Sequence, residues 1–138
     1  MYMKNYEVKE LGDFLYQLKL KGKQSRMRTR MVKLLEDRLA QVNQERTQLI
    51  EDFAKRDEEG AILTEEHEGK TGYILENPQE FNHEVAMLMS EDYIIEETAD
   101  KEEMLVTIRE IVLNHGEETE MSGDEAMLYD RFCEILDI

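Results

Sequence analysis

The fold is decided by a run that begins at residue 25, SRMRTRMVKLLEDRLAQVNQERTQLIEDFAKRDEEG, and ends at residue 60. Its apolar residues recur mostly at spacings of three or four: Met27, Met31, Leu35, Leu39, Val42, Leu49, Ile50 and Phe53. Because neither Gly nor Pro occurs between Ser25 and Glu59, this spacing predicts one helix over residues 25–57, with Ser25 as its N-cap. Such a helix is about 50 Å long. Other elements must therefore pack along its apolar stripe, or another chain must cover it.

Four shorter helices are predicted around this long one from apolar spacing and capping residues. The first has Asn5 as its N-cap and ends near Leu18, and the second has Asn77 as its N-cap and Pro78 at its first helical position. The remaining two cover residues 100–116, with Gly116 as the terminator, and the stretch from Ser122 almost to residue 138. Most of the nine Met residues fit core positions, whereas Met1, Met3 and Met121 do not.

Strands are predicted between the long helix and Asn77. The apolar segments 61–63 and 72–75 flank a polar stretch that contains Gly69, which is typical of a hairpin. Residues 92–97 are rich in strand-favouring side chains and would add a third strand. The expected fold is therefore α+β and mostly helical, with about five helices and a small antiparallel hairpin or three-stranded sheet.

Length and charge predict a single domain, residues 1–138, with an uneven distribution of charge. The chain carries 17 Lys and Arg against 33 Asp and Glu, a formal net charge of -16. A basic helical part, residues 1–56, has a net charge of +5, and an acidic α+β part, residues 57–138, has a net charge of -21. This asymmetry has two interpretations. The basic stretch folds against the acidic part and is neutralised there, or one of the two surfaces stays free for a partner.

Candidate binding residues follow from that asymmetry. No acidic residue interrupts the basic run from Lys19 to Lys33. The basic candidates for contact with a partner lie in this run: Lys23, Arg26, Arg28, Arg30 and Lys33. The acidic candidates lie in the polar stretch between the two predicted strands: Glu65, Glu66 and Glu68. Aromatic residues are absent from the basic run, so a platform for stacking bases is not predicted, and the total charge makes nucleic acid an unfavoured partner.

The chain contains no pattern that is typical of catalysis, metal binding or cofactor binding. His83-Glu84 lacks the second His of a zinc-protease motif, the acidic loops lack the Gly spacing of a calcium loop, and no Gly-rich loop could hold a phosphate. The single Cys133 lies among apolar residues without a neighbouring base. We therefore expect no enzyme activity, no metal and no cofactor. The chain also lacks a secretory signal and a membrane span, which predicts a cytoplasmic protein.

Two parts of the chain carry a recognisable pattern. The first contains LKLKGKQSRMRTRMVKLL at residues 18–35, Glu45-Arg46 and DEEG at 57–60, and the second contains SGDEA at 122–126, Tyr129-Asp130 and Cys133-Glu134. Together they resemble an uncharacterised family of small proteins encoded by phages and prophages of Gram-positive bacteria. Members are often encoded near tail and lysis genes. The resemblance therefore implies a phage setting in a bacterial host cell, and it supplies no activity or ligand.

Three functions remain open. The first is a non-catalytic accessory protein that binds a host or phage protein, above all an acidic inhibitor or modulator of a host or defence protein that handles nucleic acid. The second is an accessory protein of virion or tail assembly, associated with the virion and forming a homo-oligomer through the long helix. The third is a nucleic-acid binder that uses the Lys19–Lys33 segment.

Overall fold

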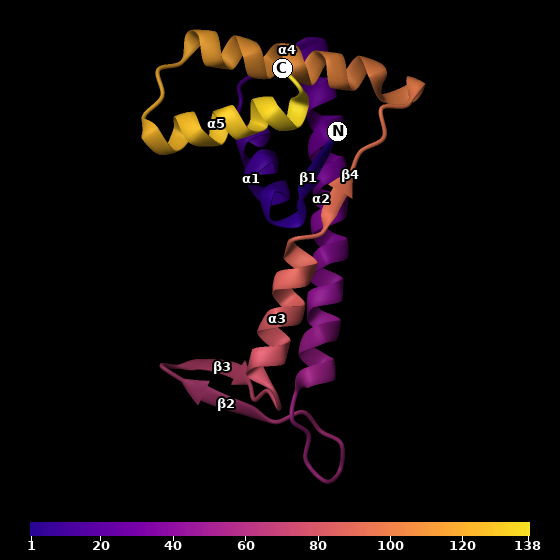
Figure 1. The fold of residues 1–138 in the computed structure, drawn as a ribbon, viewed down its shortest axis with the longest axis vertical. Coiled ribbons are helices and arrows are strands. Elements are labelled where there is room, and N and C mark those ends of the chain that lie inside the picture. Colours follow the sequence, from indigo (N-terminus) through magenta and orange to yellow (C-terminus); the bar gives the residue numbers. More distant parts are fainter. The chain divides into compact units, whose positions relative to one another are not determined.

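The structure is a computed structural model that describes residues 1–138 (Figure 1). Its elements in chain order are β1 Tyr2–Lys4, α1 Asn5–Tyr16, α2 Gly22–Phe53, β2 Thr64–His67, β3 Lys70–Tyr73, α3 Pro78–Met89, β4 Asp92–Ile94, the 3-10 helix η1 Ala99–Lys101, α4 Glu102–Glu118 and α5 Gly123–Leu136. The predicted fold class is confirmed: the chain is mostly helical, with five α-helices, one of them long, and small antiparallel sheets. None of the helices combines the length and apolar character needed to cross a membrane.

The chain forms two compact units. Unit 1 comprises residues 1–39 and 92–138, and unit 2 comprises residues 40–91. These boundaries differ from the division by charge, which we placed after residue 56. Helix α2 contributes its first part to unit 1 and its second part to unit 2.

Helix α2 begins three residues earlier than predicted. Gly22 opens it with a φ of +60°, a conformation that Gly adopts without strain. The prediction that Ser25 is the N-cap is wrong, because Ser25 lies within the first turn and its carbonyl accepts a 2.9 Å hydrogen bond from the Thr29 hydroxyl. The helix ends at Phe53 because Ala54 already pairs as an isolated bridge with another segment.

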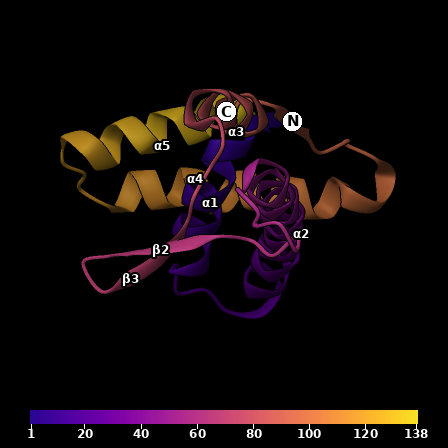
Figure 2. The same ribbon diagram turned by 90° about the horizontal axis from the view of Figure 1, so that it is seen from below.

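The core of unit 1 is formed by α1, α2, α4 and α5, and α4 and α5 lie antiparallel and side by side (Figures 1 and 2). Its largest fully buried side chain is Phe132 of α5. The apolar stripe of α2 supplies Met27, Met31 and Leu35, each at most 1% exposed. This part of the apolar stripe is thus covered by other helices of the same chain and not by another chain.

The strand at residues 92–94 pairs with the start of the chain and not with the predicted hairpin. In the antiparallel β1–β4 pair, Tyr2 lies opposite Ile94 and Lys4 opposite Asp92. Met3 between them is fully buried, so the expectation that Met3 lies outside the core is wrong. The alternation of side chains along a strand explains the error. When the first and third residues of a three-residue strand point to solvent, the middle residue points into the helical core.

The start of α1 also differs from the prediction. Asn5 is the first helical residue and not the N-cap, and its side-chain oxygen accepts a 2.9 Å hydrogen bond from Arg38 Nε of α2. Lys4 occupies the N-cap position, where its backbone N–H donates to Glu7 Oε2 over 2.8 Å. A carboxylate in the first turn thereby satisfies a helix N–H that has no partner within the helix.

Unit 2 consists of the second part of α2, the β2–β3 hairpin and α3. The predicted cap of α3 is confirmed, since Asn77 accepts a 3.2 Å hydrogen bond from the Glu80 N–H and Pro78 follows at the first helical position. Phe53 of α2 and Phe81 of α3 meet edge to face, with ring centroids 5.9 Å apart. Only three apolar side chains of this unit are buried: Val42, Ala54 and Leu88. Unit 2 therefore has a thin core.

The hairpin was predicted in the right region, but of the predicted strand residues only 72 and 73 belong to its strands. The ribbon is formed by the polar residues 64–67 and 70–73, and the apolar segments beside them form isolated bridges and irregular pairs at its base. The turn explains this, because Glu68 and Gly69 both have positive φ and close a two-residue loop between His67 and Lys70. Both views show the ribbon extending away from α3 (Figures 1 and 2).

Candidate partner-binding surfaces

The structure gives Arg28, one of the five basic candidates, a role within unit 1. Its Nη1 donates hydrogen bonds to the carbonyl oxygens of Leu15, Tyr16 and Leu18, at 2.9, 3.2 and 2.6 Å. These carbonyls end α1 and start the link to α2, where the regular i to i+4 hydrogen bonds of the helix stop. The Leu15 carbonyl also accepts a 3.3 Å hydrogen bond from the Leu18 N–H. The guanidinium therefore caps α1 through its Nη1 group.

The other basic candidates lie on the exposed side of α2. Lys23 forms an ion pair with Glu103 of α4, with Nζ 2.8 Å from Oε1. The Lys23 hydrogen bond, supported by the nearby charges of Arg30 and Arg26, lowers the pKa of the Glu103 carboxyl. Arg26, Arg30 and Lys33 form no ion pair and are exposed. The basic run is thus neutralised only at Lys23.

The ion pairs of the chain all lie in unit 1. Four of them join its two stretches of chain: the Met1 ammonium to Glu97 at 3.7 Å, Lys4 to Asp92 at 2.7 Å, Lys23 to Glu103 at 2.8 Å, and Glu7 to Arg131 at 2.6 Å. The remaining three are also pairs of unit 1 residues. The first interpretation of the charge asymmetry, mutual neutralisation, thus holds in part and for unit 1 alone.

Unit 2 keeps its acidic side chains without partners of opposite charge. It contains 13 Asp and Glu against 4 Lys and Arg, a net charge of -9. No carboxylate in residues 40–91 lies within 4.0 Å of a basic nitrogen. Because like charges raise the free energy of a compact state, this surface carries a cost in stability that no ion pair within the unit offsets.

The three acidic candidates lie together on the hairpin. Glu65 and Glu66 occupy β2 opposite Gly72 and Thr71, and Glu68 lies in the turn with a φ of +52°. Every residue of both strands is exposed. Since successive residues of a strand point to opposite faces, the ribbon presents carboxylates on both faces and at its tip.

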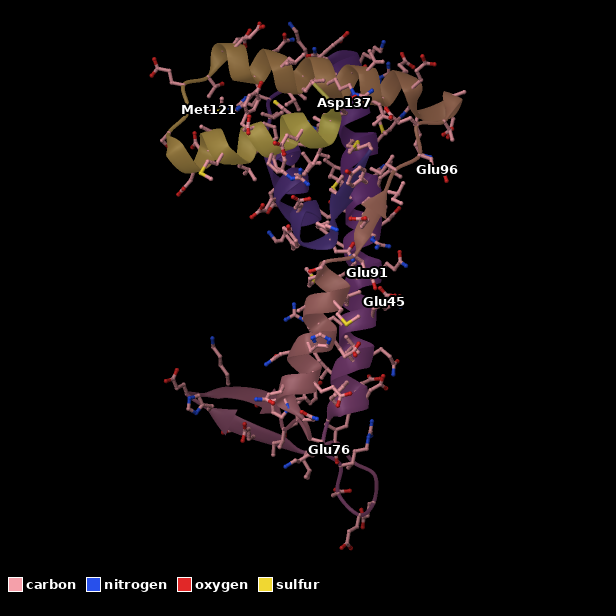
Figure 3. All side chains as sticks on the ribbon, in the orientation of Figure 1. Glu45, Glu76, Glu91, Glu96, Met121 and Asp137 are labelled. Carbon is pink, nitrogen blue, oxygen red and sulfur yellow. The ribbon has the colours of Figure 1, made fainter.

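A groove between α2 and α3 provides a second acidic surface in unit 2. It has a volume of about 260 Å³, and Leu49 of α2 with Met87 and Leu88 of α3 forms its apolar part. Its carboxylates are those of Glu45, Glu84 and Glu91. Figure 3 shows Glu45 and Glu91 close to each other, whereas Glu76 lies at the other end of α3. The Met87 side chain is 53% exposed, and Met can adapt to differently shaped partners.

A further cavity lies in unit 1 and contains none of the predicted site residues. Its volume is about 410 Å³, and it is lined by α1, the end of α4, the following loop and α5: Glu10, Asp13, Phe14, Gln17, His115, Thr119, Met121, Glu125, Leu128 and Tyr129. The spacing was visible in the sequence, because residues 10, 13, 14 and 17 share one helix face and residues 125, 128 and 129 share another. Nothing in the sequence indicated that these two faces meet.

One wall of this cavity depends on a close approach between α4 and α5. Gly116, which was expected to end α4, lies within the helix, and a Cβ at this position would overlap the Tyr129 phenol. Burial, together with a hydrogen bond to Cys133, raises the pKa of this phenol. The absence of a side chain at position 116 thus sets the position of Tyr129.

We expect Gly116→Ala to destabilise unit 1 by about 1–3 kcal/mol, because the added methyl group forces the Tyr129 ring to move. The sign of this change in the free energy of unfolding is diagnostic, since Gly→Ala within a helix ordinarily stabilises the helix by up to about 1 kcal/mol. The measurement is urea unfolding followed by circular dichroism. Gly123→Ala, at the first residue of α5 with open space around it, is the matched control and should cost nothing. A gain in stability for Gly116→Ala would contradict the packing described above.

No group of three or more His, Cys, Asp or Glu side chains in the structure is arranged to hold a metal ion. Cys133 is a half-buried free thiol on α5. The surfaces that remain are the acidic hairpin and groove of unit 2, the exposed basic residues of α2 and the unit 1 cavity. Comparison with known proteins adds no relative, because no family model, curated protein or solved structure matches this chain.

Proposed function

We propose that the chain is a non-catalytic accessory protein that binds a basic protein partner through the carboxylates of unit 2. The observation that carries this proposal is the net charge of -9 in a unit whose carboxylates form no ion pair. Unit 1, in contrast, forms all the ion pairs of the chain. A surface that is left uncompensated in one unit only is suited to compensation by another molecule.

The partner class follows from the charge and from the proposed phage setting. A protein that handles nucleic acid exposes Lys and Arg where phosphates bind. An acidic ribbon with carboxylates on both faces can enter such a groove, and the long-range field guides the encounter. We therefore infer an inhibitor or modulator of a host or defence protein of this kind, acting in the cytoplasm of a Gram-positive bacterium.

The test is affinity capture from a lysate of a Gram-positive bacterium, with quantitative mass spectrometry of the retained proteins. The bait is the full chain or the variant Glu65→Gln/Glu66→Gln/Glu68→Gln, which keeps the shape of the side chains and removes three charges from the hairpin. We expect the wild type to retain a nucleic-acid-handling protein that added duplex DNA displaces. The variant should retain less of it, because the hairpin carboxylates supply part of the attraction.

The matched control is Glu102→Gln/Glu110→Gln/Glu117→Gln, which removes three exposed charges from α4 of unit 1. None of these three carboxylates forms an ion pair, so the variant changes the net charge equally. Equal loss of the partner in both variants would show that only the total charge matters. Full retention of the partner by the hairpin variant would contradict the proposed surface.

The assembly alternative is favoured by one observation on α2. In unit 2 its apolar residues Leu49, Ile50 and Phe53 are only half-buried, so another copy of the chain could cover them. Light scattering tests this directly: an oligomer at micromolar concentration supports assembly, and a monomer counts against it. For the nucleic-acid alternative, which rests on the exposed Arg26, Arg30 and Lys33, a gel shift at low salt is the test.

A further inference from the structure

The unit 1 cavity combines an apolar floor with a negatively charged rim. Phe14 of α1 and Leu128 and Tyr129 of α5 provide apolar and aromatic surface, and Phe14 is held by edge-to-face contacts with His115 at 5.0 Å and Phe132 at 5.3 Å. A volume of about 410 Å³ falls within the range of sites for small ligands or single side chains. Met121, which lies in the loop between α4 and α5 (Figure 3), also lines this cavity.

The rim contains carboxylates on two different helices and no Lys or Arg. Asp13 of α1 is already paired with Lys9 at 2.6 Å. Glu10 of α1 and Glu125 of α5 line the same cavity, are exposed, and form no ion pair. The cavity therefore has two uncompensated negative charges above an aromatic floor.

This combination selects the charge and shape of a ligand. An anion would face two free carboxylates and the acidic turns beside them, so it is excluded by repulsion. A neutral apolar molecule would make favourable contacts with the apolar side chains of the floor. It would, however, remove the rim carboxylates from water without compensating their charge. A cation with an apolar or planar body satisfies both parts, because aromatic rings attract cations and the carboxylates accept its N–H groups.

We propose that this cavity binds an organic cation, a guanidinium or amidinium group on an apolar body, with Glu10 and Glu125 as the charge partners and Phe14, Leu128 and Tyr129 as the floor. The guanidinium suits the site better than an ammonium, because its planar shape stacks on a ring and its N–H groups can reach acceptors on two sides. The same chemistry is offered by an arginine side chain of a polypeptide and by a free aromatic amidine. The site belongs to unit 1 and does not depend on the function proposed for unit 2.

The experiment is an NMR titration of the isotope-labelled full chain, observed through its backbone amide signals. Two pairs of probes are compared: benzamidine with its neutral analogue benzamide, and blocked arginine with blocked citrulline, the neutral analogue of arginine. We expect each cation to shift the amide signals of residues that line the cavity, and each neutral analogue to bind about tenfold more weakly. Tighter binding of blocked arginine identifies a polypeptide as the source of the ligand, and tighter binding of benzamidine identifies a free small molecule.

The variant Glu10→Gln/Glu125→Gln isolates the role of the rim. It keeps side-chain shape, and because both residues are exposed and unpaired, the fold should persist, as the dispersion of the amide signals will show. We expect it to bind benzamidine about tenfold more weakly. Glu65→Gln/Glu66→Gln, with the same change in net charge in unit 2, should bind it as the wild type does. The proposal is overturned if the neutral analogues bind equally well, if the rim variant binds unchanged, or if no cation shifts the signals of the cavity.

Discussion

Phe132→Ala is expected to lower the free energy of unfolding of unit 1 by about 3–5 kcal/mol. Phe132 is completely buried in α5, and its ring meets Phe14 of α1 at a centroid distance of 5.3 Å. The loss has two parts, the hydrophobic transfer of the ring and the cavity that the surrounding helices cannot fill. A domain is typically stable by about 5–15 kcal/mol, so this one substitution removes a large part of the stability of unit 1.

The measurement is urea unfolding followed by the amide signals of unit 1, so that unit 2 does not contribute to the transition. Tyr16→Ala is the matched control, because it also removes an aromatic ring, but from a side of α1 where that ring is 73% exposed. It should change stability by no more than about 0.5 kcal/mol. A loss below about 1 kcal/mol for Phe132→Ala would mean that α1 and α5 do not share a closed core.

Arg131→Ala is expected to cost about 2–3 kcal/mol at pH 7, because it leaves the Glu7 carboxylate almost buried without its charge partner. Arg131 Nε lies 2.6 Å from Glu7 Oε1, and its Nη2 donates to the other oxygen at 3.2 Å. The Glu7 side chain is 8% exposed. The expected loss is below that of a fully buried pair because the Arg131 side chain is 41% exposed and water partly screens it.

The dependence of stability on pH should be weaker in this variant. Burial alone would raise the pKa of Glu7, but the Arg131 hydrogen bond, the Lys4 N–H and the two positive charges outweigh it and hold the pKa below 4.5. In the wild type, the contribution of Glu7 is therefore present above pH 4.5 and is lost as the pH falls through the lowered pKa. Without Arg131, its hydrogen bond and its charge no longer lower the pKa of Glu7, so that pKa rises and the variant should lose less stability than the wild type as the pH falls.

Two variants check this account of Arg131. Glu134→Gln removes only the exposed second partner of Arg131, at 3.0 Å, and should cost no more than about 0.5 kcal/mol. Glu7→Gln/Arg131→Ala removes both charges and should recover part of the loss of Arg131→Ala. Urea unfolding at several pH values from about 3 to 7 measures all of them. Equal pH dependence in the wild type and in Arg131→Ala would contradict the buried pair.

The sequence predicted the helices well because their signals are local. The apolar spacing of residues 27–39 and the cap formed by Asn77 and Pro78 need no knowledge of distant residues, and both are confirmed. The errors occur at residues whose role is set by a contact with a residue far away in the sequence. Asn5 bonds to Arg38 and does not cap its own helix, and Gly116 accommodates Tyr129 and does not end α4.

The candidate surfaces were predictable to a smaller extent. Charge asymmetry identified the acidic hairpin residues, because a polar stretch next to a two-residue turn is exposed in any arrangement. It could not show that Arg28 caps α1, since the carbonyls involved are 10 to 13 residues away. The unit 1 cavity was missed for the same reason. Glu10 and Glu125 line one cavity only because α1 packs against α5.

The central claim, that uncompensated carboxylates of unit 2 bind a basic partner, is tested most directly by calorimetric titration of the captured partner at several salt concentrations. We predict that the affinity of the wild type falls steeply with rising salt and that Glu65→Gln/Glu66→Gln/Glu68→Gln weakens it about tenfold at low salt, with a shallower salt dependence. An affinity that neither salt nor removal of these three charges changes would contradict the claim.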